Sequence, residues 1–122
     1  MKAGVALFAI LPTISACERS SPKAPAGLLT SREARDAGGV VFAADCAICH
    51  GAKGDGRGQR REAMNPPPAN LTLPPWSDEA SAAEMHGAIR NGVPGTAMPS
   101  WPMLSDRQIW DVVAYIHSLK GL

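Results

Sequence analysis

The sequence predicts an all-α fold of three or more helices whose long loops wrap around a bound group. Three segments have helical periodicity, and no segment of useful length alternates between apolar and polar residues as a strand would. The whole chain has 122 residues, which is the size of one domain. Gly and Pro crowd the connection 51–75, and a structureless connection of that length needs a ligand to organise it.

The first 30 residues have the features of an export signal followed by a flexible tether. A basic residue precedes the apolar run 5–11, which is too short to span a bilayer. The sequence Ile-Ser-Ala-Cys ending at Cys17 resembles a bacterial lipobox, in which cleavage exposes a cysteine that is then acylated. Simple secretion is the alternative, but it leaves a lone thiol in an oxidising compartment. We expect a signal peptide at 1–16 and a tether at 17–30 that begins with lipidated Cys17. The remaining domain, 31–122, would then lie at the periplasmic side of a bacterial membrane.

Two helices are expected before the last one, at 31–46 and at 81–91. Each begins with the spacing of a capping box, in which a hydroxyl residue is followed three residues later by a glutamate: Thr30 with Glu33, and Ser81 with Glu84. The dipeptide Asn91-Gly92 is typical of a helix end, and it closes the second segment.

The last helix, 106–120, has the clearest pattern. Ser105 and Gln108 have the spacing of a capping box. Leu104 and Ile109 are placed to form a hydrophobic staple across the first turn. Apolar residues then recur at i, i+3, i+4, i+7 and i+10 and form one continuous stripe, made of Ile109, Val112, Val113, Ile116 and Leu119.

Residues 46–50 have the spacing C-x-x-C-H, which is the signature of c-type haem attachment. Two thiols must reach two vinyl groups on one porphyrin edge, and the adjacent imidazole must reach the iron. A thioredoxin-like C-x-x-C should open a helix after a strand, and a structural zinc site needs a second ligand pair that this chain lacks. We therefore expect one covalent haem c on Cys46, Cys49 and His50.

A haem of this kind takes a sixth ligand, and a methionine thioether gives it a higher reduction potential. We predict that this ligand is Met98, since neither helix periodicity nor strand alternation explains its loop, 92–101. Prolines on both sides stiffen that loop. The other candidates are Met64 in the Arg-rich loop, Met85, His86 and His117 on predicted helices, and Met103 before the last helix. Met103 is the main rival, although it and Met85 are also explained as core residues.

With these motifs, residues 31–122 resemble the small bacterial class I c-type cytochromes, here in a monohaem lipoprotein form. The matching features are Gly38 and Phe42 before the motif, Gly51 after it, the loops 54–58, 65–71 and 92–101, and the last helix with Trp110 and Tyr115. The resemblance implies a cytochrome c fold in which the first and last helices cross at right angles. In that fold Gly38 allows the two helices to approach closely, which would explain a glycine inside a helix.

The same resemblance implies the surroundings of the haem. A proline carbonyl, from Pro67 or Pro68, is expected to accept the Nδ1 proton of His50 and so fix its ring. Four side chains are expected to wall the pocket, although each is equally explained as ordinary core: Leu71, Trp76, Ile89 and Trp101.

Charge excludes one class of partner and suggests another. Without the signal segment, acidic and basic side chains are equal in number, so the sequence lacks the excess of basic residues that is typical of proteins that bind nucleic acids. In the loop after the motif, basic residues outnumber acidic ones: Lys53, Arg57, Arg60 and Arg61 against Asp55 and Glu62. The basic residues form either an ordinary solvated loop or a docking patch for an acidic redox partner.

The sequence favours an electron-transfer protein and not an enzyme, because His50 and Met98 fill both axial positions. Redox proteins would be its electron donor and acceptor, with no small-molecule substrate. A dedicated cytochrome subunit of a periplasmic dehydrogenase, reductase or oxidase is the alternative, since the difference lies in the partner. A haem peroxidase or gas-binding protein is a third hypothesis, and it needs a displaceable ligand.

Overall fold

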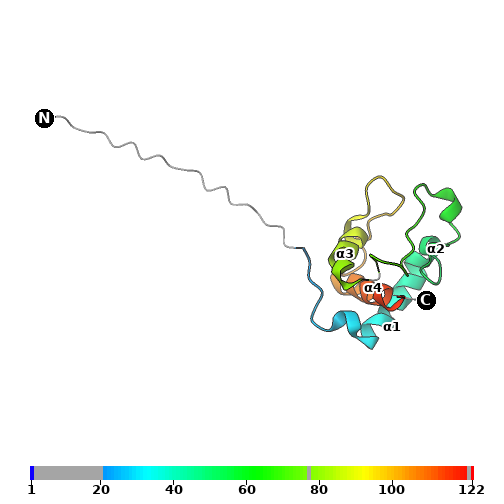
Figure 1. Cartoon of the computed structure of the whole chain (residues 1–122), viewed down its shortest axis with the longest axis horizontal. Helices are drawn as coiled ribbons and strands as arrows, with labels where there is room; N and C mark the ends of the chain where they lie inside the picture. The colour runs from blue at the N-terminus through cyan, green and yellow to red at the C-terminus, as the bar shows by residue number, and fades with distance from the viewer. Residues whose placement is uncertain (2–20, 77, 121) are drawn as a thin grey trace.

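The computed structural model describes residue 1 and residues 21–76, 78–120 and 122, and in these it contains helices and loops without strands (Figure 1). In chain order the elements are the 3-10 turn η1 (Leu28–Thr30), α1 (Arg32–Val41), the π turn η2 (Phe42–Cys46), α2 (Ala47–His50), the 3-10 turns η3 (Arg61–Ala63) and η4 (Glu79–Ser81), α3 (Ala82–Asn91) and α4 (Asp106–Ser118). The all-α prediction is confirmed. The expected first helix continues beyond residue 46 to His50, and the proposed signal segment with Cys17 lies outside the described residues.

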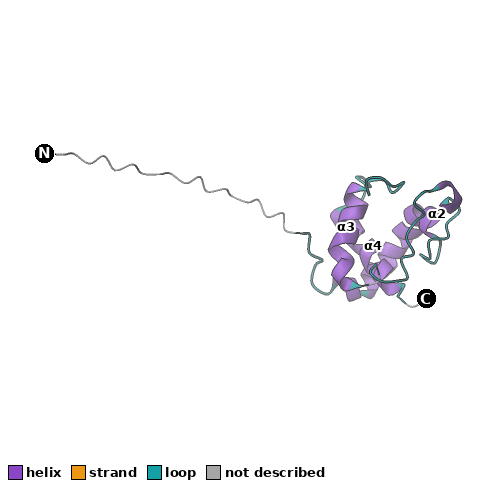
Figure 2. Ribbon diagram, turned by 45° about the horizontal axis from the view of Figure 1, so that its top comes forward, coloured by secondary structure: helices purple, strands orange, loops and turns teal. Residues whose placement is uncertain are grey.

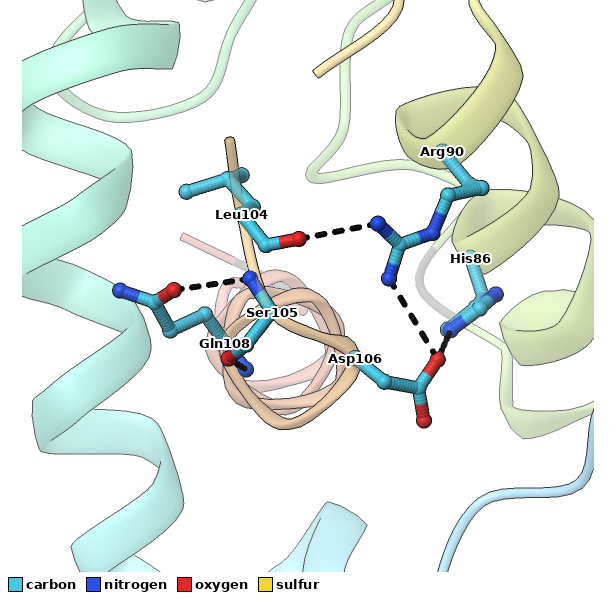
Figure 3. A network of polar contacts seen from close by, with 6 residues as sticks. All are labelled: His86, Arg90, Leu104, Ser105, Asp106 and Gln108. Atoms are coloured by element: carbon cyan, nitrogen blue, oxygen red, sulfur yellow. Dashed lines mark hydrogen bonds and ion pairs between the residues drawn. The ribbon is translucent and has the colours of Figure 1, made fainter. Parts of the chain in front are cut away.

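The core lies where α1 packs against α4, the most extensive contact between elements of the described chain. The apolar stripe predicted for α4 is buried along its whole length. Beside it, Phe42 is 1% exposed and its ring centroid lies 5.0 Å from that of Tyr115. Figure 3 looks nearly along the axis of α4, and the cyan ribbon of α1 runs beside α4 at the left, in the plane of the picture. At the crossing, a Cβ atom on Gly38 would overlap the backbone carbonyl of Asp111, so only glycine fits there.

Gly38→Ala is therefore expected to destabilise the folded protein by about 3 kcal/mol or more, because overpacking against backbone has no side chain that can yield. Gly87→Ala is a matched control within α3, since a Cβ atom there would meet nothing within 4 Å. That change should stabilise the protein by about 0.5–1 kcal/mol through helix propensity. Denaturant unfolding of the two variants measures both free energies. An unchanged free energy of unfolding in Gly38→Ala would contradict the close helix approach.

The start of α4 is as predicted. Ser105 Oγ accepts from the backbone N–H of Gln108 at 3.1 Å, and the Gln108 side chain accepts from the Ser105 N–H at 2.9 Å (Figure 3). Leu104 and Ile109, the expected staple, are both buried. This reciprocal capping box fixes where the chain enters α4, directly after the loop that carries Met98.

The cap predicted for α1 is wrong, and Ser81 occupies the N-cap position of α3 as predicted but does not form the capping hydrogen bond. Ser31, not Thr30, caps α1, and its Oγ accepts from the N–H of Ala34 at 3.3 Å. Thr30 is held in η1 and is unavailable for that role. Ser81 precedes α3, but its Oγ donates to the Pro75 carbonyl at 2.7 Å and does not accept from the helix. The preceding loop turns back onto the helix start and uses this hydroxyl as a donor.

The packed part of the chain begins a few residues earlier than expected. Leu28, assigned to the tether, is 7% exposed and belongs to the core, and η1 lies against α4. A tether that included this residue would leave an apolar side chain in water. Within the described part of the chain, no helix is both long and apolar enough to cross a membrane.

Candidate functional site

A cavity of about 290 Å³ lies between the helices and is lined almost wholly by apolar side chains. Two loops border it and rise on the same side of the molecule, the green loop after α2 and the yellow loop after α3 (Figures 1 and 2). All ten residues predicted for the haem site line this cavity: Cys46, Cys49, His50, Pro67, Pro68, Leu71, Trp76, Ile89, Met98 and Trp101. The fold thus brings together side chains from four separate stretches of sequence.

The two motif cysteines are free thiols and partly buried, on the short stretch where η2 passes into α2. Residues three apart share one face of a helix, so both thiols face the cavity. Burial raises the pKa of Cys46 to about 12, and nearby Asp45 and Cys49 add to the shift. A thiol–disulfide oxidoreductase needs the opposite, a nucleophilic cysteine with a lowered pKa. The raised pKa of Cys46 therefore gives no support to thiol redox chemistry at this residue.

His50 is oriented by a hydrogen bond at the rear of its ring. Its Nδ1 lies 3.1 Å from the carbonyl oxygen of Ala69, and as donor there it leaves the Nε2 lone pair free. Burial lowers the pKa of His50, although the bond to Ala69 acts in the opposite direction. A neutral imidazole with a free Nε2 is the form that binds a metal ion.

The carbonyl that accepts from His50 belongs to Ala69, and not to Pro67 or Pro68 as expected. The acceptor thus lies one residue further along the chain than Pro68. The Leu71 N–H donates to the Gly54 carbonyl at 2.7 Å, which fixes how this segment lies beside the motif. In that register the carbonyl of Pro68 faces Gly56. Both prolines remain in the cavity lining.

The loop after the motif folds back and covers the end of α2, a feature that the sequence analysis missed. Gly56, Gly58 and Arg60 donate their backbone N–H groups to the carbonyls of His50, Cys49 and Ile48 at 2.7, 3.1 and 3.0 Å. Carbonyls at a helix end need such partners. These bonds hold the motif rigidly and direct the basic side chains of the loop outward, where they are exposed.

Met98 is held in a compact loop. Thr96 Oγ1 donates to the Val93 carbonyl at 2.7 Å and accepts from the Met98 N–H at 3.1 Å. The Val93 N–H donates to the Met98 carbonyl at 3.2 Å, and Gly92 supplies the positive φ that starts the loop. The thioether of Met98 is partly buried and lines the cavity.

The rival ligands differ in where the structure places them. Met103, the main rival, is 70% exposed and lies outside the cavity, so it is neither a core residue nor a lining residue. His86 Nε2 is bonded to Asp106, and His117 lies outside the cavity lining. Met64 and Met85 do line the cavity. Met85 is 4% exposed on α3, as expected of a core residue.

A covalent haem c fits these residues. Two thiols three residues apart face an apolar cavity beside an imidazole whose Nε2 is free. A zinc site does not fit, because no three His, Cys, Asp or Glu side chains of the described residues gather as metal ligands. Cys46 and Cys49 would hold the porphyrin edge, and His50 and Met98 would supply the two axial atoms.

The family model for subunit III of the cbb3-type cytochrome c oxidase matches residues 33–116. The chain belongs to this family. This c-type cytochrome is 36% identical over 85 residues to the cbb3-type cytochrome c oxidase subunit FixP of Azorhizobium caulinodans, a match covering 69% of the chain and 27% of that relative. It is 38% identical over 93 residues to subunit CcoP of Rhodobacter capsulatus, covering 70% of the chain and 29% of the relative. The cytochrome thus spans less than a third of the length of the curated relatives it matches.

A solved structure has the same fold. It is that of the Kuenenia stuttgartiensis reducing HAO-like protein complex Kustc0457/Kustc0458, and it superposes with a TM-score of 0.65 at 25% identity. The match covers 75% of this cytochrome and 46% of that chain. The cytochrome c fold expected from the sequence is therefore confirmed, and a covalently held haem c follows from the family.

Proposed function

We propose that this cytochrome carries one electron at a time on a single haem c. The observation that supports this most strongly is the cavity onto which Cys46, Cys49, His50 and Met98 all converge. The sequence has one C-x-x-C-H motif, which supports a single haem. The bound haem would supply an iron that alternates between the ferric and ferrous states.

The chain's own residues set the conditions for that transfer. The bond from His50 Nδ1 to Ala69 holds the imidazole in one tautomer, and the thioether of Met98 is a neutral, soft ligand that favours the reduced state. With the haem in place, the apolar lining would leave few polar groups beside it that must reorganise when the charge changes.

Peroxidase or gas-binding chemistry is less well supported. Such a site needs an open or displaceable ligand position and, in a peroxidase, polar groups that handle protons. Apart from the motif itself, the polar side-chain groups in the lining of the described cavity are those of Asp45 and Thr96 and the indole N–H groups of Trp76 and Trp101, and there is no Arg. The lining therefore supports electron transfer better than chemistry on a substrate at the iron.

A cytochrome subunit of a larger respiratory complex is the second candidate. It is supported by the relatives, which are named as subunits of a cbb3-type cytochrome c oxidase. A free carrier and a subunit share the same site chemistry and differ in the partner. Purification from detergent-solubilised membranes separates them, since a subunit should elute with its complex and a carrier alone.

A basic loop beside the cavity supports docking to an acidic redox partner. This loop carries Lys53, Arg57, Arg60 and Arg61, which are all exposed and form no ion pair with other described residues. It leads into the cavity-lining stretch that begins at Met64, whereas the loop 92–105 has no charged residue at all. A partner with an acidic patch on one side only would fit, and the charges would mainly raise the association rate.

Arg61→Glu tests both the carrier function and the basic loop. At low salt it should slow oxidation of the reduced protein by anionic ferricyanide and speed oxidation by cationic tris(phenanthroline)cobalt(III), each by about threefold or more. Arg32→Glu makes the same charge change at the start of α1 and should have the smaller effect. Stopped-flow absorbance measures the rates. Equal effects from the two variants would rule out the basic loop, and a wild type that neither reagent oxidises would rule out the carrier.

We also propose that Cys17 is lipidated and holds the domain at the periplasmic face of a membrane. The support is the Ile-Ser-Ala-Cys sequence and the Pro- and Ser-rich residues that follow it. Cys17→Ser should move the protein from the membrane fraction to the soluble fraction with its haem spectrum unchanged, since two or three acyl chains anchor a protein stably. An unmodified mature amino terminus in the wild type, found by mass spectrometry, would exclude acylation.

A further inference from the structure

A cluster of charged side chains ties together the base of the loop that carries Met98. This loop leaves α3 at Asn91 and enters α4 at Asp106. Arg90 donates from one terminal nitrogen to the Leu104 carbonyl at 2.9 Å, and its other terminal nitrogen lies 3.6 Å from Asp106 Oδ1 (Figure 3). The same oxygen of Asp106 lies 2.7 Å from His86 Nε2. Two residues of α3 thus bind the end of the loop and the first residue of α4.

His86 is the buried part of this cluster. Its side chain is 6% exposed, and its ring lies 4.3 Å from that of Trp110 with the planes tilted by 33°. Arg90 is 33% exposed and Asp106 is 68% exposed, so solvent weakens the charge attraction between them. Their geometry matters more than their charge, because the planar guanidinium holds a carbonyl and a carboxylate at fixed relative positions.

Besides this cluster, the loop is held by the packing of Met98, Trp101 and Leu104 against the core, and it forms few other hydrogen bonds to the rest of the protein. The backbone N–H of Trp101 donates to the carbonyl of Ile89 at 3.1 Å, and Ile89 lies near the end of α3. Within the loop, the Val93 and Thr96 bonds described above shape the turn around Met98 but do not fix it to the rest of the protein. The position of the Met98 sulfur relative to the cavity therefore depends on the base of the loop.

We propose that His86, Arg90 and Asp106 are positioning residues that keep the Met98 loop closed over the haem. The inference rests on the proposed function, in which Met98 is an axial ligand. Loosening the base should let the loop open more often, so that the sulfur leaves the iron and an external ligand takes its place. The cluster would act through the loop, since none of these three residues lines the cavity.

The test is the rate at which imidazole replaces the methionine ligand in the oxidised, haem-loaded protein. Arg90→Ala should raise this rate about tenfold, which corresponds to about 1.4 kcal/mol in the opening equilibrium. Arg107→Ala is the matched control, since Arg107 forms a similar ion pair at 2.8 Å but with Asp111, so that both partners belong to α4. The control rate should stay within about twofold of the wild type. Asp106→Asn keeps an oxygen for His86 and should raise the rate less than Asp106→Ala, which removes it.

An unchanged rate in both Arg90→Ala and Asp106→Ala overturns the proposal, and so does an equal rise in Arg107→Ala, because that is a general loss of stability. If Arg90→Ala does not fold, the rate of imidazole exchange in Asp106→Asn is compared with that of the wild type instead. A different result would contradict the proposed Met98 ligation itself: an oxidised wild-type spectrum that lacks the sulfur-to-iron absorbance band.

Discussion

Replacing Met98 by Ala is expected to lower the reduction potential by on the order of 0.1 V or more, because axial ligands set haem potentials over a range of about 0.8 V. The thioether is neutral and soft, so its loss removes a ligand that favours ferrous over ferric iron. Loss of the sulfur also leaves a position open to water or an added ligand. The variant should therefore become high-spin, bind carbon monoxide and cyanide readily, and lose the weak sulfur-to-iron band at the red end of the oxidised spectrum.

Three further alanine variants separate Met98 from the other methionines. Met103→Ala should leave the spectrum unchanged and alter the stability by no more than about 0.5 kcal/mol, because the side chain is exposed and outside the cavity. Met64→Ala and Met85→Ala remove side chains that do line the cavity, so they are the stringent controls. If the sulfur-to-iron band survives in Met98→Ala and disappears in Met64→Ala or Met85→Ala, the methionine replaced in that variant is the ligand instead of Met98. Rapid carbon monoxide binding by the wild type would favour the gas-binding function instead.

The parts of the fold that the sequence predicted well are those encoded by neighbouring residues. The capping box at Ser105 and the apolar stripe of α4 involve positions at most four apart, and both are present. The capping bonds predicted for α1 and α3 are absent because the same spacing can be satisfied in several ways. Thr30 and Ser31 both carry a hydroxyl, and η1 takes up the first of them. At Ser81, the hydroxyl donates to carbonyls of the loop just before it, those of Pro75 and Asp78, and the spacing of the capping box does not reveal this.

The same distinction applies to the functional site: its local motif was predicted, and its contacts between distant residues were not. The C-x-x-C-H spacing is dictated by the chemistry of attachment, and it placed Cys46, Cys49 and His50 beside the cavity. The acceptor for His50 lies 19 residues away, and which carbonyl reaches the ring depends on how the segment ending at Leu71 is held by Gly54. The partners His86 and Asp106 are 20 residues apart and on different helices. No periodicity predicts such a pair, because it forms only when α3 and α4 pack.

The double variant Cys46→Ala/Cys49→Ala is expected to lose both the haem and most of the fold. Without the haem, the cavity of about 290 Å³ has nothing to fill it. Apolar walls left in contact with water cost free energy in proportion to their area, about 25 cal/mol per Å². The whole free energy of folding of a domain is only about 5–15 kcal/mol. Far-UV circular dichroism should show a large loss of helix, and the purified protein should lack a haem absorbance.

The single variants separate covalent attachment from filling of the cavity. Cys46→Ala and Cys49→Ala each leave one thiol and the His50 ligand, so some haem should still bind, with one thioether bond. The wild type should keep its haem in acidified organic solvent and gain the mass of one haem by mass spectrometry, whereas the double variant should do neither. Haem that is extracted from the wild type would exclude covalent attachment. If the double variant lost the haem but kept a native helix content, the apolar cavity would have to close by itself, and the haem would not be the centre on which α1, α3 and α4 pack.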